Sequence, residues 1–103
     1  MATGCLAEQF PLPALLSAAL DAEDAAFEDY ESREMCWRLT RSLQAQAVNG
    51  GASPLTLEGH AEDVEFARVE LAASRARLDE AIRGRVAVWR QMRAANLNDQ
   101  AAE

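Results

Sequence analysis

The sequence has no lysine, one histidine and two cysteines, and each shortage excludes a class of site. Cys5 and Cys36 are too few for a disulfide framework, so we expect two free thiols in a reducing compartment. Two distant cysteines and one histidine also cannot build the usual zinc sites. We therefore predict that the chain holds no metal.

Catalytic signatures are also missing. The sequence has no Glu-x-x-His pair for a di-iron site and no glycine-rich phosphate loop, because Asn49-Gly50-Gly51 has no lysine after it. In a hairpin, Cys36 lies about 10 Å from His60, at 5.4 Å per helical turn, which is too far for proton transfer. We predict that the protein is not an enzyme and has no cofactor. His60 is expected to be a surface residue, with a pH-sensitive contact as the alternative.

Long apolar runs are absent too. No stretch of about 18 apolar residues exists that could cross a membrane. The first ten residues have no basic segment followed by an apolar one, as a secretory signal requires. We therefore expect a cytoplasmic protein with no membrane segment.

What the sequence does contain is alanine, arginine and acid. Half of its 103 residues are hydrophobic, but 22 are alanine, which buries little area. The length fits one domain with a thin core, so burial against a partner is expected to complete its stability. All ten cations are arginine, and the net charge is −7.

Proline and glycine divide the chain into two helices. Pro11 and Pro13 favour a helix start, and Asn49-Gly50-Gly51 is the strongest helix breaker. Ser53-Pro54 then provides an N-cap and a first-turn proline. We predict helices over about 13–48 and 54–96, with a break near 21–24, where three of four residues are acidic. The expected fold is an all-α, elongated antiparallel helical hairpin, coiled-coil-like, with a short N-terminal helix as an option.

The predicted domain plan has three parts. Residues 1–10 form a flexible arm, residues 11–97 form one hairpin domain with its turn at 49–54, and residues 98–103 form a frayed tail. The second helix shows coiled-coil-like spacing in steps of three and four. The predicted contact positions are Leu57, Ala61, Val64, Arg68, Leu71, Arg75, Leu78, Ile82, Arg85, Trp89, Met92 and Asn96.

The first helix has two apolar surfaces. One stripe holds Leu12, Leu16, Leu20, Phe27, Tyr30 and Trp37. The second surface holds Met35, Cys36, Leu39 and Leu43. A two-helix hairpin needs one stripe per helix, so the second surface either meets a third element or reflects a broken helix.

Folding the hairpin about Gly51 pairs positions whose numbers sum to about 103. This register predicts three polar pairs: Glu34 with Arg68, Glu28 with Arg75, and Arg41 with Glu62. It also places Trp37 near Phe66. Opposite charges across a helix pair set orientation more than they add stability.

These features together indicate a protein that binds one partner protein through helix packing, as an adaptor, assembly chaperone or inhibitor. The predicted partner-binding residues are Trp37, Met35, Leu39, Leu43, Glu28, Glu31, Glu34, Trp89 and Arg90. Trp37, Trp89 and Arg90 are the predicted anchors, and Met35, Leu39 and Leu43 would cover a groove or helix of the partner. The three acids would steer the contact to a basic surface. We also expect a homodimer.

Two alternatives remain open. Six arginines between positions 75 and 93 surround Trp89, a combination that suits nucleic acid, although the charge of −7 opposes it. Nucleic acid is therefore not the expected ligand. A structural subunit of a larger assembly would show the same sequence features.

Overall fold

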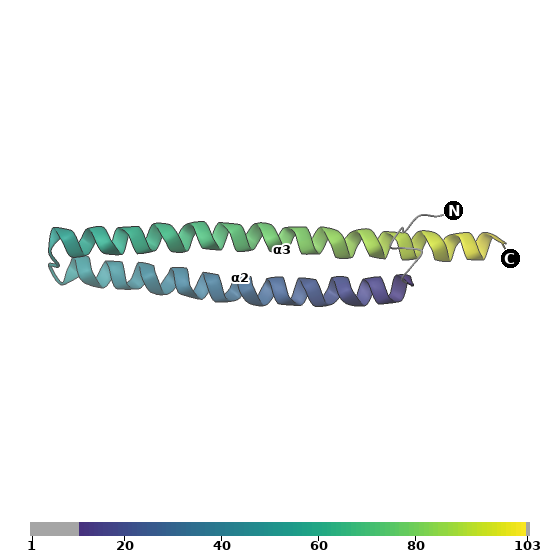
Figure 1. The fold of residues 1–103 in the computed structure, drawn as a ribbon, viewed down its shortest axis with the longest axis horizontal. Coiled ribbons are helices and arrows are strands. Elements are labelled where there is room, and N and C mark those ends of the chain that lie inside the picture. The colour runs from purple at the N-terminus through teal and green to yellow at the C-terminus, as the bar shows by residue number, and fades with distance from the viewer. Residues whose placement is uncertain (1–10, 103) are drawn as a thin grey trace. The chain divides into compact units, whose positions relative to one another are not determined.

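Two long helices make up the fold (Figure 1). The computed structural model describes residues 11–102, and the side chains of residues 11–97. Helix α2 spans Leu12–Asn49 and α3 spans Pro54–Ala102, with no strand among the described residues. The predicted all-α helical hairpin is confirmed. The predicted arm at 1–10 lies outside the described residues.

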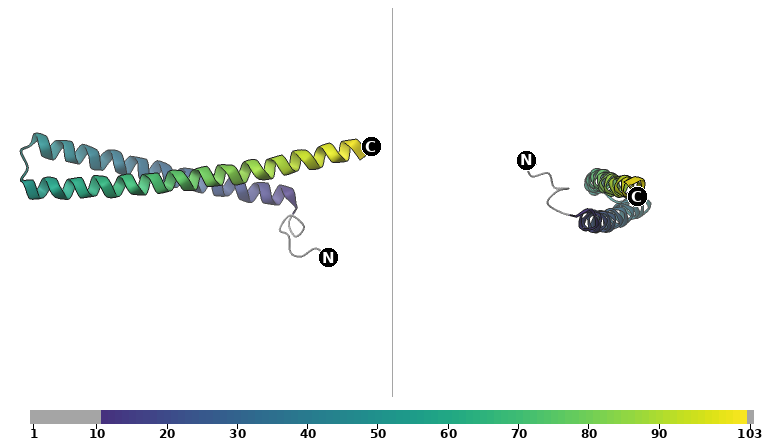
Figure 2. Two further views of the ribbon diagram at one scale, coloured as in Figure 1. Left: turned by 90° about the horizontal axis from the view of Figure 1, so that it is seen from above. Right: turned by 90° about the vertical axis from the view of Figure 1, so that its right-hand side faces the viewer.

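The chain divides into two compact units. The turn unit comprises Ala26–Leu78, and the end unit comprises the residues before Ala26 and after Leu78. In the turn unit α2 and α3 are antiparallel neighbours, with Arg33 Nη1 3.5 Å from Glu70 Oε2. In the end unit the same two helices are joined by an ion pair between Arg85 and Glu23. Figure 2 gives two further views of α2 and α3.

Local backbone chemistry sets the ends of both helices. The Pro11 carbonyl accepts hydrogen bonds from the amides of Ala14 and Leu15, at 3.0 and 3.1 Å, so α2 begins beside Pro13, whose missing N–H costs nothing there. At the other end, the Ala52 amide donates to the Ala47 carbonyl and Gly51 adopts a φ of 72°. This left-handed glycine closes the last carbonyls of α2, as its position predicted.

Helix α3 begins directly after Ser53, the predicted N-cap residue. The Thr56 amide donates to Ser53 Oγ at 3.2 Å, and the Leu57 amide donates to the Ser53 carbonyl at 3.0 Å. Pro54 occupies the first helical position, where a backbone N–H would have no partner inside the helix. The turn between the helices is therefore held by its own residues.

On each helix, one row of half-buried and buried positions repeats in steps of three and four, and we call this row the seam. In the turn unit, the α2 seam is Ala26, Tyr30, Arg33, Trp37, Thr40, Gln44 and Ala47. The α3 seam there is Leu57, His60, Val64, Ala67, Leu71, Ser74 and Leu78. Many seam side chains are small or polar. Among the described side chains only Ala67, Ser74 and Leu78 are buried.

The end unit continues the same spacing. Its α2 seam is Leu12, Leu16, Ala19 and Glu23, and its α3 seam is Ala81, Arg85, Val88, Met92 and Ala95. Half of the predicted α3 contact positions are correct, namely Leu57, Val64, Leu71, Leu78, Arg85 and Met92. Five others are wrong by one residue, because Ala61, Arg68, Arg75, Trp89 and Asn96 are exposed and the residue before each lies on the seam. At the sixth, Ile82 is half-buried, as is Ala81 before it. At each of these positions except His60, the residue on the seam is smaller than the predicted one.

Three other predictions about the helices need correction. Helix α2 is continuous through 21–24, so the predicted break is wrong, because Asp21 and Asp24 face solvent while Glu23 meets Arg85. Helix α3 extends to Ala102, six residues beyond its predicted end. His60 is half-buried on the seam rather than at the surface.

Candidate protein-binding surface

The turn unit presents an apolar surface built from both helices, which we call the Phe66 face. It consists of Cys36, Leu39 and Leu43 on α2 and Phe66 on α3. Phe66 is 68% exposed and Leu39 is 58% exposed. These side chains flank the seam, so the packing of α2 on α3 leaves them uncovered.

A shallow groove crosses this face. Cys36 and Thr40 line it from α2, and Phe66 and Ala67 line it from α3, with the charged side chains Arg33, Asp63 and Glu70 at its edges. Its volume of about 160 Å³ is below the ~300–1,000 Å³ typical of small-molecule sites. A groove of this size suits single side chains of a packing helix better than an enclosed ligand.

The face extends from the groove toward the turn. Leu43 lies seven residues after Cys36, at the equivalent position of α2 two turns on. On α3, Gly59 holds the position equivalent to Phe66, and a Cβ added there would meet nothing within 4 Å. The surface therefore protrudes at Phe66 and is recessed at Gly59. The recess at Gly59 has room for a side chain of a packing helix.

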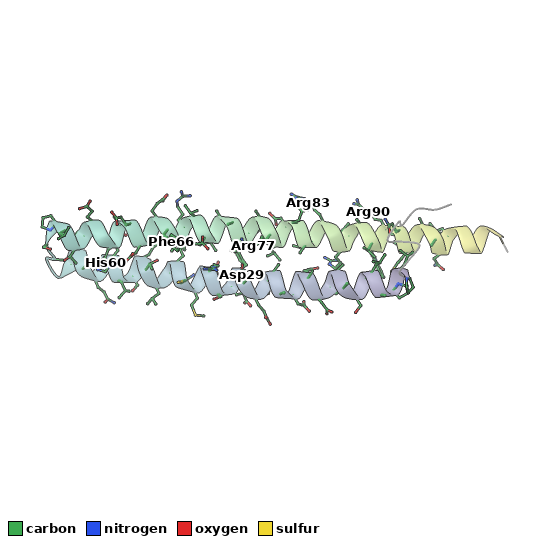
Figure 3. The ribbon with its side chains drawn as sticks, viewed as in Figure 1. Asp29, His60, Phe66, Arg77, Arg83 and Arg90 are labelled. Atoms are coloured by element: carbon green, nitrogen blue, oxygen red, sulfur yellow. The ribbon has the colours of Figure 1, made fainter. Side chains whose placement is uncertain are left out.

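Charged side chains at the base of the face form a chain of contacts across the helices. Arg33 lies 3.5 Å from both Glu70 and Asp29, and Arg77 Nη2 donates to Asp29 Oδ2 at 2.8 Å. Figure 3 shows Asp29 and Arg77 directed toward each other from α2 and α3. The hydrogen bond from Arg77 holds the pKa of Asp29 below its ordinary value of 3.8.

We expect the Asp29 contacts to give the fold a specific dependence on pH. Because the folded state lowers this pKa, the stabilisation is complete above pH 3.8 and is lost as the pH falls through the folded-state value. Asp29→Asn is therefore expected to lower the melting temperature at pH 7 and to lose that deficit in strong acid. Thermal unfolding followed by circular dichroism from pH 7 to 2 measures the difference.

Glu65→Gln is the comparison for this titration, because Arg68 lowers the pKa of Glu65 within α3 alone. Its deficit should also fade in acid, but it involves no contact between the helices. A deficit for Asp29→Asn that is the same at every pH would contradict the role given to the Asp29 charge.

The predicted polar pairs are replaced by nearer partners. Arg68 donates to both carboxylate oxygens of Glu65, at 2.6–3.1 Å, rather than pairing with Glu34. Glu34 instead lies 3.5 Å from Arg38 on its own helix. Residues three or four apart on one helix are close neighbours, and exposed side chains reach them without crossing to the other helix.

The other two predicted pairs show related shifts. Arg75 lies 5.7 Å from the ring centroid of Tyr30, two residues from its predicted partner Glu28. Arg41, predicted to meet Glu62, is over the ring of Trp37 on its own helix, at 4.8 Å. Phe66 was predicted to contact Trp37. It instead lines the groove together with Cys36 and Thr40.

The predicted partner-binding residues do not form one surface. Met35, Leu39 and Leu43 are exposed, whereas Trp37 is half-buried on the seam. By heptad position, Glu31 and Glu34 lie on the opposite flank of α2 from Leu43, and Glu28 lies on its outer side. Trp89 and Arg90 belong to the end unit and are both exposed.

Sequence reasoning missed Phe66, Gly59 and Asp63 as parts of the candidate surface. Phe66 was placed against Trp37, because their position numbers sum to about 103 in the register predicted by folding about Gly51. The available signal was its spacing: Phe66 lies two residues after Val64 and five before Leu71, outside the steps of three and four. That spacing identifies an exposed phenylalanine.

Other kinds of site find no support among the described residues. No group of three or more histidine, cysteine or carboxylate side chains there is placed to hold a metal ion. Within the same residues, neither helix has a segment long and apolar enough to span a bilayer. No family model, curated protein or solved structure matches this chain.

Proposed function

We propose that the chain is a non-catalytic protein-binding regulator, an adaptor, assembly chaperone or inhibitor that takes a helix of one partner on the Phe66 face. The observation that carries the proposal is the groove at Phe66, around which two helices present exposed apolar side chains. Contiguous exposed apolar surface on a soluble domain commonly marks an interaction site. A cytoplasmic location is part of the same proposal.

Helix packing is the proposed mode of binding. An amphipathic helix presents apolar side chains at i, i+3, i+4 and i+7, and these would enter the groove beside Phe66 and the low surface at Gly59. Asp63 and the exposed Glu62 border Phe66 on α3. Their charges favour a partner whose apolar stripe is flanked by arginine or lysine, with the acids acting mainly on association rate and orientation.

The test compares the full-length protein with a triple variant, Leu39→Ala/Leu43→Ala/Phe66→Ala, in affinity capture from the native host with and without nuclease. We expect the unchanged chain to recover one nuclease-resistant protein in near-equal amount and the triple variant to lose it. Truncating exposed anchors in an interface costs about 2 kcal/mol or more each. Circular dichroism should show unchanged helicity, because the three side chains are exposed.

Gly59→Leu is the second variant, since it adds bulk to the low surface and favours helix formation. It is expected to block capture while leaving the melting temperature equal or higher. Leu97→Ala, at a 61% exposed position of the end unit outside the groove at Phe66 and the groove at Trp89, is the matched control and should retain the partner. A partner still captured by both face variants would place the site elsewhere. Nuclease-sensitive recovery would favour nucleic acid, and recovery of the bait alone would contradict the proposal.

A further inference from the structure

The end unit carries a second apolar surface, separate from the Phe66 face, which we call the Trp89 face. A groove of about 210 Å³ is lined by Leu16 and Leu20 from α2 and by Arg85 and Trp89 from α3. Leu20 is 43% exposed and Trp89 is 49% exposed. On its other side Trp89 borders a hollow with Met92, Arg93 and Asn96. A half-exposed tryptophan between two hollows is a typical association anchor.

Around Trp89 the charges are separated between the two helices, whereas the first turn of the unit's α3 segment holds Asp79 and Glu80, and Glu80 pairs with Arg83 at 3.6 Å. Residues 12–25 of α2 carry Asp21, Glu23 and Asp24 and no cation. Residues 81–97 of α3 carry Arg83, Arg85, Arg90 and Arg93 and no acid. The Glu23–Arg85 pair joins the helices at the seam, while Asp21, Asp24, Arg90 and Arg93 are exposed. Figure 3 shows Arg83 and Arg90 projecting from α3 on the side away from α2.

The Trp89 face therefore has an acidic edge on α2, an apolar centre and a basic edge on α3. When two copies are related by a two-fold axis parallel to the helices, their Trp89 faces meet with α2 of one copy over α3 of the other. The acidic edge then meets the basic edge twice, and Leu20 of each copy packs near Trp89 of the other. This self-complementarity is the defining property of a symmetric, isologous interface.

We infer that a second copy of this chain covers the Trp89 face, giving a two-fold dimer in which the end units form a four-helix arrangement. A foreign basic helix would satisfy only the acidic edge, and a foreign acidic helix only the basic one. The copy satisfies both and covers the tryptophan. This dimer is independent of the partner site, because the Trp89 face and the Phe66 face belong to different units.

Sedimentation equilibrium of the full-length chain tests the dimer. Trp89→Ala is expected to raise the dissociation constant at least about 30-fold, the loss typical of an interface hot spot. Phe66→Ala is the matched control, an exposed aromatic in the turn unit, and should leave the dissociation constant unchanged. A monomeric wild-type chain, or equal effects of the two variants, would overturn the inference.

Charge reversal tests the two-fold geometry directly. Asp21→Arg/Asp24→Arg makes both edges basic, and Arg90→Glu/Arg93→Glu makes both edges acidic. Each variant alone should dissociate to monomer at low salt, and an equal mixture should form a one-to-one heterodimer. Salt at about 1 M, where the screening length is ~3 Å, should restore the self-association of each. Variants that dimerise alone, or a mixture that stays monomeric, would exclude this arrangement.

Discussion

Leu78→Ala is expected to lower the free energy of unfolding by about 2–5 kcal/mol, the cost of removing a buried leucine side chain and leaving a cavity. Leu78 is 6% exposed and is one of three buried side chains among the described residues. A domain of this size has a total of about 5–15 kcal/mol, so the loss is a large share. Urea unfolding monitored by circular dichroism measures it.

Leu55→Ala is the matched control, because Leu55 lies on the same helix and is 78% exposed. Leu55→Ala should change the free energy of unfolding by no more than about 0.5 kcal/mol, as most surface substitutions do. Similar losses at the two leucines would show that Leu78 is not part of the hairpin core.

Ser74→Leu is expected to have the second large effect, because it adds a bulky side chain to the core, whereas Leu78→Ala removes one. Ser74 has no exposed surface, and its Oγ donates to the Leu71 carbonyl at 2.8 Å. A leucine there must push α2 and α3 apart, and overpacking of this kind costs about 1–3 kcal/mol. The measurement is again the unfolding midpoint in urea.

Two substitutions separate overpacking from other causes. Ser74→Ala keeps the side chain small and removes only the hydroxyl, so it should cost less than Ser74→Leu. Ala72→Leu adds the same bulk at an exposed position of α3 and should change stability by no more than about 0.5 kcal/mol. A Ser74→Leu chain as stable as the wild type would contradict a closely packed small-residue seam.

The fold was largely predictable because its signals are local. Pro13, Gly51 and Ser53 each act on a few neighbouring backbone groups, so their effects follow from the sequence without knowledge of the packing. The break predicted at 21–24 failed for the opposite reason. Whether Glu23 is tolerated on the seam depends on Arg85, which lies 62 residues away along the chain.

The seam shows the same limit. Either Ala67 or Arg68 fits a spacing in steps of three and four, and so does either Ser74 or Arg75. Which residue of each pair lies on the seam depends on how closely the helices approach. Trp89, predicted by the same stepping, is exposed and Val88 is half-buried, whereas Ala81 and Ile82 are both half-buried. The surplus apolar surface at Leu39 and Leu43 was predictable from α2 alone. The contribution of Phe66 required the register between the helices.

The closed turn at Gly51 and Ser53 has a consequence for the order of folding. Contacts beside the turn join residues close in sequence, whereas the Asp29–Arg77 and Glu23–Arg85 contacts span 48 and 62 residues. Loop-closure entropy rises with the length enclosed, and each contact formed shortens the loop that the next must close. We therefore expect the contacts between the helices to form first beside the turn and last at the far ends. In hydrogen exchange, the amides near Glu23 should exchange sooner than those near Leu71.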